Sequence, residues 1–146
     1  LAAAVAIDCV RLARNAHNRV EVADGEMVKN ETRFVKQLEG SGKMTPDVQA
    51  AIDKMKSAHG HDDRIAAWDL LVAAFRSTPP AKIDPTNPLD RKFMDETAGA
   101  LNRRDVAQKQ YDAERAVYDA YMNSWRGRIA GMFSSTLPTD SSKAQP

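Results

Sequence analysis

The chain has 146 residues, enough for one domain whose core needs no disulfide or structural metal. Lysine and arginine total 21 against 20 aspartate and glutamate, and the two signs are mixed along the sequence. This mixing does not favour a surface for nucleic acid or another polyanion, because the cations that would bind phosphates lie among acids. We expect a single domain over residues 1–133 and a disordered polar tail over residues 134–146.

The chain opens with seven apolar residues, from Leu1 to Ile7, and a charged amphipathic segment follows at once. A helix that spans a bilayer needs about 20 apolar residues. The run is therefore either the remaining end of a removed anchor or signal segment, or the frayed first turns of a helix. Cys9 is the single cysteine, and its apolar neighbours favour a role as a small buried side chain.

Apolar residues recur at steps of three or four from Leu1 to Leu38, which predicts one long helix. The predicted apolar seam consists of Val5, Cys9, Leu12, Ala16, Val20, Ala23, Met27, Phe34 and Leu38. The pattern breaks once, at Asn30 and Glu31. Two glycines after Leu38 then predict the helix end, because glycine tolerates the left-handed conformation that helix ends favour.

The next helix start is marked by Thr45 as the N-cap and Pro46 at the first helical position. The apolar period falters at His59-Gly60-His61 and resumes with a stronger face. That second face consists of Ile65, Trp68, Leu71, Val72 and Phe75. Residues 45–77 are therefore predicted to form two helical segments that are nearly collinear, or bent, at Gly60.

A proline-rich connector over residues 78–86 precedes a new helix start at Asn87 and Pro88. No proline follows until Pro138, and the helical period predicts one unbroken helix to Phe133. Its predicted packing residues are Phe93, Ala100, Ala107, Tyr111, Tyr118, Tyr121, Trp125, Ile129 and Phe133. The sequence thus predicts an all-α, up-and-down bundle of three long helices, or four if the second breaks at Gly60.

Residue types that bind metals gather at one place, His59, His61, Asp62 and Asp63. Two imidazoles and two carboxylates are suitable ligands for a divalent metal, but a polar helix break followed by capping aspartates is the stronger interpretation. The Glu-x-x-His pairs of di-iron bundles are absent from the sequence. His17 lies among polar residues and is expected to face solvent.

Motifs for nucleophilic catalysis and phosphate binding are also missing. The chain has no Gly-x-Ser-x-Gly turn, and Cys9 has no predicted base beside it. The segment Gly40-Ser41-Gly42-Lys43 is similar to the end of a nucleotide loop, but it joins two helices, and Met44 follows where that loop has a hydroxyl. The sequence therefore predicts no catalytic residue and no cofactor, which favours a non-enzymatic protein.

Three segments resemble the LemA family. They are Asn-Pro-Leu-Asp-Arg-Lys-Phe at 87–93, Leu-Asn-Arg-Arg at 101–104 and Tyr-Asp-Ala-Glu-Arg-Ala-Val-Tyr at 111–118, while residues 14–20 of the first helix are similar in character. The chain departs from the family at Leu101, where LemA proteins usually have glutamate, and at residues 45–48, which replace an Asp-Leu-Ile-Pro-Asn-Leu run. The resemblance implies an all-helical, non-enzymatic domain of the bacterial envelope, held outside the bilayer by one N-terminal anchor.

Three hypotheses about function follow. The first is an anchored helical module that presents a rod surface to protein partners, with a membrane span just before residue 1. The second is a soluble adaptor or homo-oligomer, with Tyr118, Tyr121 and Trp125 marking an exposed patch. The third is a metal-dependent sensor or enzyme that uses His59 and His61 with Asp62 or Asp63.

Overall fold

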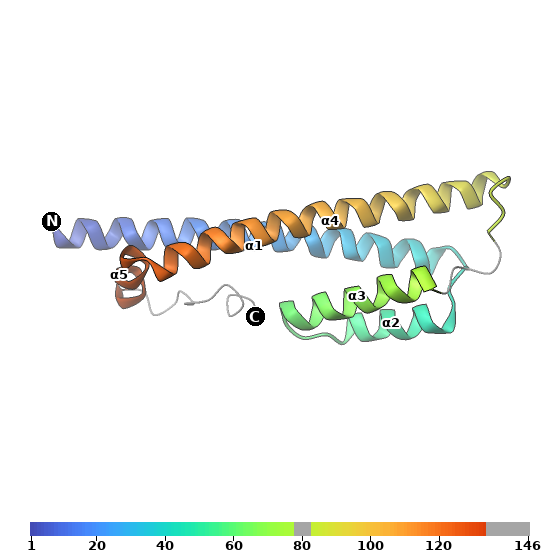
Figure 1. The fold of residues 1–146 in the computed structure, drawn as a ribbon, viewed down its shortest axis with the longest axis horizontal. Coiled ribbons are helices and arrows are strands. Elements are labelled where there is room, and N and C mark those ends of the chain that lie inside the picture. Colours follow the sequence, from blue (N-terminus) through green and yellow to red (C-terminus); the bar gives the residue numbers. More distant parts are fainter. Residues whose placement is uncertain (78–82, 134–146) are drawn as a thin grey trace. The chain divides into compact units, whose positions relative to one another are not determined.

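A computed structural model describes residues 1–77 and 83–133, and these residues form five α-helices and no strand (Figure 1). The helices are α1 (Ala2–Gly40), α2 (Pro46–Lys56), α3 (His61–Ser77), α4 (Pro88–Asn123) and α5 (Trp125–Phe133). The predicted all-α fold class is confirmed. The predicted disordered tail, residues 134–146, and the first part of the predicted connector lie outside the described residues.

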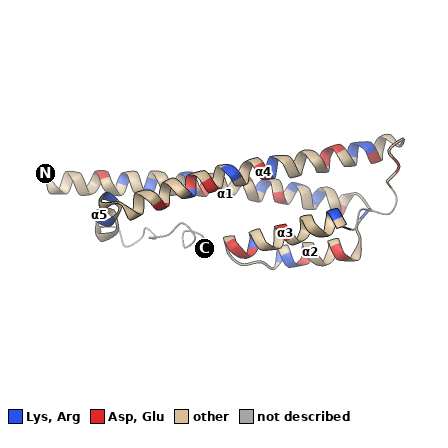
Figure 2. Ribbon diagram, viewed as in Figure 1, with Lys and Arg blue, Asp and Glu red and all other residues tan. Residues whose placement is uncertain are grey.

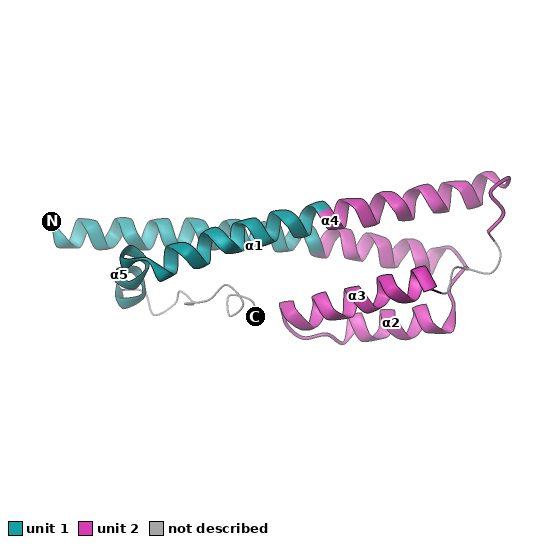
Figure 3. Cartoon of the chain, viewed as in Figure 1, with its two compact units in different colours: residues 1–27, 106–146 teal, residues 28–105 magenta. Residues whose placement is uncertain are grey.

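The chain divides into two compact units, shown in different colours in Figure 3. Unit 1 contains Leu1, α1 as far as Met27, α4 from Val106 onward, and α5. Unit 2 contains Val28–Asp105, which covers the rest of α1, the helices α2 and α3, and the start of α4. The boundaries fall inside two continuous helices, and the expectation of one domain over residues 1–133 stays a prediction.

Unit 2 has a core of large apolar side chains from all four of its helical segments. The core residues are Phe34, Leu38, Val48, Ala51, Ile52, Trp68, Leu71, Phe93 and Ala100. The ring of Phe34 meets Trp68 and Phe75 edge to face, with centroids 5.3 and 5.4 Å apart. Aromatic edge-to-face pairs stabilise a core beyond the area that they bury, so these rings fix where α3 packs on α1.

The helices α2 and α3 lie side by side as a hairpin (Figure 1). Thr45 caps α2 as predicted, because its Oγ1 accepts a hydrogen bond from the Val48 N–H. Gly60 has a φ of 83°, a left-handed conformation that glycine adopts without steric cost, and it turns the chain back. The expectation of two nearly collinear segments is therefore wrong, and the predicted alternative of a true break at Gly60 is the one observed.

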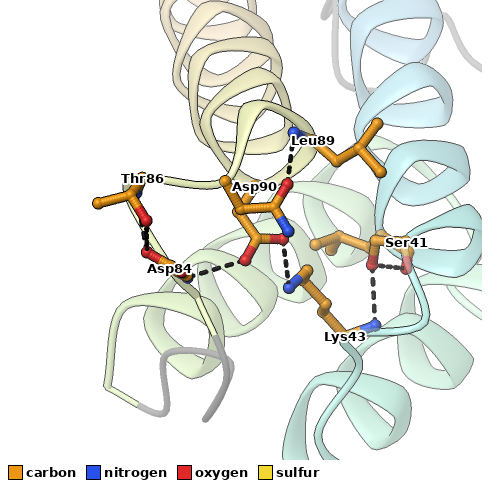
Figure 4. A network of polar contacts seen from close by, with 8 residues as sticks. Ser41, Lys43, Asp84, Thr86, Leu89 and Asp90 are labelled. Atoms are coloured by element: carbon orange, nitrogen blue, oxygen red, sulfur yellow. Dashed lines mark hydrogen bonds and ion pairs between the residues drawn. The ribbon is translucent and has the colours of Figure 1, made fainter.

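A polar network joins the end of α1 to the start of α4 within unit 2 (Figure 4). The Lys43 Nζ lies 2.6 Å from Asp90 Oδ1, and the Asp84 N–H donates to Asp90 Oδ2 at 2.8 Å. Both contacts lower the pKa of the Asp90 carboxyl, with the Lys43 hydrogen bond as the larger cause. Asn87 Oδ1 accepts the Leu89 N–H at 2.9 Å, which confirms Asn87 as the predicted cap of α4.

Unit 1 packs small side chains of α1 with tyrosines of α4. The buried residues are Ala6, Cys9, Ala13, Val20, Ala23 and Met27 on α1, and Ala107, Tyr111, Tyr118 and Met122 on α4. The predicted seam is wrong at Val5 and Leu12, which are exposed, while the neighbouring alanines are buried. Alanines leave the room that large tyrosine rings need, so the small residues form the contact face here.

The last element is not the unbroken helix that its period predicts, because α4 ends at Asn123 and α5 starts at Trp125. Ser124 Oγ accepts the Gly127 N–H at 3.3 Å, in the manner of an N-cap. A Cβ on Gly127 would overlap the backbone of Tyr121 and Met122, so the sharp bend requires glycine at this position. Ser124 and Gly127 therefore separate α5 from α4, although no proline lies between the two helices.

Candidate functional site

A buried ionic cluster is the most distinctive polar feature of unit 2. Arg104 Nε donates to Glu31 Oε1 at 2.6 Å, and Arg64 Nε lies 3.2 Å from Glu31 Oε2. The side chains of Arg104 and Glu31 are 0% and 2% exposed, and the Arg104 guanidinium lies 5.1 Å from the centroid of the Trp68 ring. The cluster explains the break in the predicted seam at Glu31, and its burial indicates a role in packing rather than in solvent-accessible chemistry.

The segment His59 to Asp63 does not gather its metal-ligating side chains. His61 is buried, with Nδ1 3.4 Å from an Arg64 nitrogen, whereas His59, Asp62 and Asp63 are exposed. Asp62 and Asp63 occupy the first turn of α3, where carboxylates stabilise the helix dipole. Residues 1–77 and 83–133 contain no group of three His, Cys, Asp or Glu side chains arranged to hold a metal ion.

Three side chains of unit 1 that the sequence singles out form packing contacts. The Tyr121 hydroxyl donates to the Cys9 carbonyl at 2.8 Å, and burial raises the pKa of that hydroxyl. Cys9 is buried as predicted. The prediction that His17 faces solvent is wrong, because its ring is largely buried beside Tyr118, at 5.7 Å between centroids, and its Nε2 lies 3.0 Å from Glu21.

The expected aromatic patch of Tyr118, Tyr121 and Trp125 does not exist as one exposed surface. Tyr118 is fully buried and Tyr121 is half-buried. Only Trp125, of these three, is an exposed ring. The other two tyrosine rings fill the space that the alanines of α1 leave.

An exposed, largely apolar seam on α4 is not among the sites that the sequence predicts. Val106, Gln110, Ala113, Val117 and Ala120 follow each other at steps of four, three, four and three residues, and all are exposed. This alternation is the heptad spacing of a coiled-coil seam, so the side chains form one stripe along the helix. We call this set the α4 stripe. The signal was present in the sequence, but the more aromatic opposite face dominated the pattern.

A second exposed apolar region lies where α1 and α5 meet within unit 1. An open groove of about 660 Å³ is lined by residues that include Ala3, Ile7, Val10, Arg11, Arg14 and Phe133. The α5 face beside it consists of Trp125, Arg126, Arg128, Met132 and Phe133, all exposed. Figure 2 shows basic residues on α5 and no acidic residue. Single exposed apolar residues are normal on a protein surface, but here several lie together on one short helix, which is typical of an interaction surface.

Comparisons with known proteins give no relative. No protein-family model, curated protein sequence or solved structure matches the chain. Among the described helices, none combines the length and the apolar character that crossing a bilayer demands.

Proposed function

We propose that the protein is a non-enzymatic helical interaction module of the bacterial envelope, related to the LemA proteins that it resembles. In this proposal an anchor that precedes residue 1 holds the helices outside the bilayer, and the α4 stripe binds an amphipathic helix of a partner protein. The exposed stripe is the observation that supports a binding role, because a two-heptad apolar seam normally packs against another helix.

The stripe also carries the features of a selective seam. Gln110 is its one polar member, and its amide nitrogen donates to Glu114 at 3.0 Å. A single polar residue in an apolar seam fixes the register and the choice of partner, at some cost in affinity. The small side chains of Ala113 and Ala120 allow a partner backbone to approach closely.

Site-specific photo-crosslinking in cells tests the stripe. A photoreactive residue in place of Val117 is expected to give discrete crosslinked products, and Ala113→Glu should abolish them by placing a charge in the seam. A photoreactive residue at Ala98 provides the control, because Ala98 is also exposed on α4 but lies outside the stripe, in unit 2. Identical products from positions 117 and 98 would overturn the binding role, and a product of twice the chain mass would identify the partner helix as a second copy.

The residues encoded upstream of Leu1 test the anchor. About 20 apolar residues continuing into Leu1 would support both the anchor and the relation to LemA proteins. A cleavable signal peptide would indicate a free exported module instead. A polar segment there would remove the anchored form of the proposal and leave a soluble adaptor that uses the same stripe.

A further inference from the structure

The α5 face combines apolar and cationic groups in an arrangement that packing does not explain. Trp125, Met132 and Phe133 are 59%, 79% and 68% exposed. Trp125 and Met132 are seven residues apart, about two helical turns, so they share one side of α5. Gly127 and Ala130 supply the buried side. The helix thus uses its two smallest residue types to pack and turns its large apolar side chains outward.

The charge of this region is one-sided. Residues 1–14 and 121–133 contain four arginines, Arg11, Arg14, Arg126 and Arg128, against one acid, Asp8, for a net charge of +3. Asp8 lies 3.0 Å from Arg11 and so is already paired with a cation. The rest of the chain mixes its charges, as Figure 2 shows along α1 and α4. A local excess of cations around exposed apolar rings calls for a ligand that is anionic and apolar together.

The adjoining groove also combines apolar side chains with arginines. Its apolar lining comes from Ala3, Ile7, Val10 and Phe133, and Arg11 and Arg14 line it too. On α5, the Arg126 guanidinium lies 5.0 Å from the centroid of the Trp125 ring. Tryptophan and arginine side chains are both suited to the zone between acyl chains and headgroups of a bilayer.

We propose that the α5 face and the adjoining groove bind the surface of an anionic lipid bilayer. Trp125, Met132 and Phe133 enter the boundary between headgroups and acyl chains, and Arg14, Arg126 and Arg128 contact lipid phosphates. The net positive charge favours this ligand over a neutral apolar partner. Anionic headgroups would pair with the arginines, and acyl chains would contact the apolar side chains. The surface is separate from the α4 stripe, so this inference does not depend on the proposed protein partner.

Vesicle flotation of the whole chain tests the proposal. The chain is expected to float with vesicles of phosphatidylcholine mixed with phosphatidylglycerol, to bind phosphatidylcholine alone far more weakly, and to dissociate as salt is raised. Arg126→Gln with Arg128→Gln should lower the partition coefficient on anionic vesicles on the order of tenfold or more, because each basic residue near the surface adds to binding. Arg33→Gln with Arg103→Gln removes two exposed arginines from unit 2 and should leave it unchanged.

The apolar part is tested with Met132→Ser and Phe133→Ser, against Leu89→Ser and Met94→Ser as an exposed apolar pair in unit 2. Only the first pair should weaken binding. The chain has two tryptophans, and Trp68 lies in the unit 2 core, so quenching by brominated acyl chains should come from Trp125 and vanish in Trp125→Phe.

Three results would overturn the inference: equal binding to neutral and anionic vesicles, equal losses from the control pairs, or no quenching of Trp125. A concentration-dependent increase in mass that Met132→Ser with Phe133→Ser abolishes would overturn it too, by showing that a second copy covers the face. If the chain failed to bind vesicles but still crosslinked through position 117, the lipid inference would be wrong and the proposed α4 stripe would still be supported.

Discussion

The same two helices, α1 and α4, run through both units, but their contact faces differ between them. In unit 2 the face contains phenylalanines and a buried ionic cluster, and α2 and α3 cover it. In unit 1 it contains alanines and tyrosines, and many of the large apolar side chains that the sequence supplies are left on the surface. Unit 2 therefore buries most of its large apolar side chains, whereas unit 1 leaves many of them exposed, and the proposed binding surfaces lie among these.

The largest effect is expected from the ionic cluster of unit 2. Glu31→Gln removes the carboxylate that pairs with buried Arg104 at 2.6 Å, and breaking a buried pair in this way costs roughly 3–5 kcal/mol of unfolding free energy. Glu96→Gln is the matched control, because Glu96 pairs with Lys92 on the surface at 3.8 Å. An exposed pair of this kind on a helix contributes about 0.5 kcal/mol or less. Urea unfolding followed by circular dichroism measures both, and equal losses would contradict the assigned role.

A double variant separates ionic pairing from burial. Glu31→Met with Arg104→Met removes both charges of the 2.6 Å pair and should lose less stability than the sum of the single changes, because neither charge of that pair is left buried opposite an apolar side chain. The packing of Arg104 on the Trp68 ring is lost in the Arg104→Met single variant and in the double variant alike. Strict additivity of the two single changes would show that the pair contributes no coupling.

The next largest effect is expected at the bend of unit 1. Gly127→Ala places a Cβ into the backbone of Tyr121 and Met122, which should cost about 1–3 kcal/mol or displace α5. Gly131→Ala is the control within the same helix, because nothing lies near its Cβ. Displacement would appear as faster trypsin cleavage at Arg126 or Arg128. Equal cleavage and stability of the two variants would show that the bend tolerates a side chain.

The bend also shows which helix ends can be predicted from the sequence and which cannot. Thr45 and Asn87 cap helices as predicted, because these signals involve residues two or three positions apart. Ser124 is the same kind of signal, but neither a proline nor an acidic residue follows it in the first turn of α5. Gly127 acquires its role only from the backbone that it touches, and that contact exists only in the folded chain.

The candidate sites were harder to predict for a related reason. The partner of Glu31 is 73 residues away in the sequence, so the broken period at Glu31 indicated a feature without naming Arg104. The α4 stripe and the α5 face depend on exposed apolar residues, and periodicity alone cannot distinguish an apolar face that is buried from one that stays exposed. Periodicity likewise predicts a buried Val5 and Leu12, whereas in the structure these two are exposed and the alanines beside them are buried.

A smaller effect is expected from the hydrogen bond that links α4 to α1 in unit 1. Tyr121→Phe removes the hydroxyl that donates to the Cys9 carbonyl and should cost about 0.5–1 kcal/mol. Burial raises the pKa of this hydroxyl above the value of about 10 for an unfolded chain. The contribution is therefore fully present below pH 10 and is lost as pH rises through the folded pKa. A difference between wild type and variant that persists at strongly alkaline pH would contradict this assignment.

The smallest effect, and one confined to acid, is expected at the polar network of unit 2. Contacts from Lys43 and the Asp84 N–H lower the pKa of Asp90 below its unfolded value of about 3.9 (Figure 4). A lowered carboxyl pKa gives stability that is present above the unfolded pKa and is lost as pH falls through the folded pKa. Thermal unfolding of wild type and Asp90→Asn should therefore differ at neutral pH and converge as the pH falls below about 4. Asp95→Asn, an exposed aspartate on the same helix, is the control and should show no such convergence. If the difference at Asp90 grew in acid, its pKa would be raised rather than lowered, and the Lys43 contact would not be the interaction that joins the end of α1 to the start of α4.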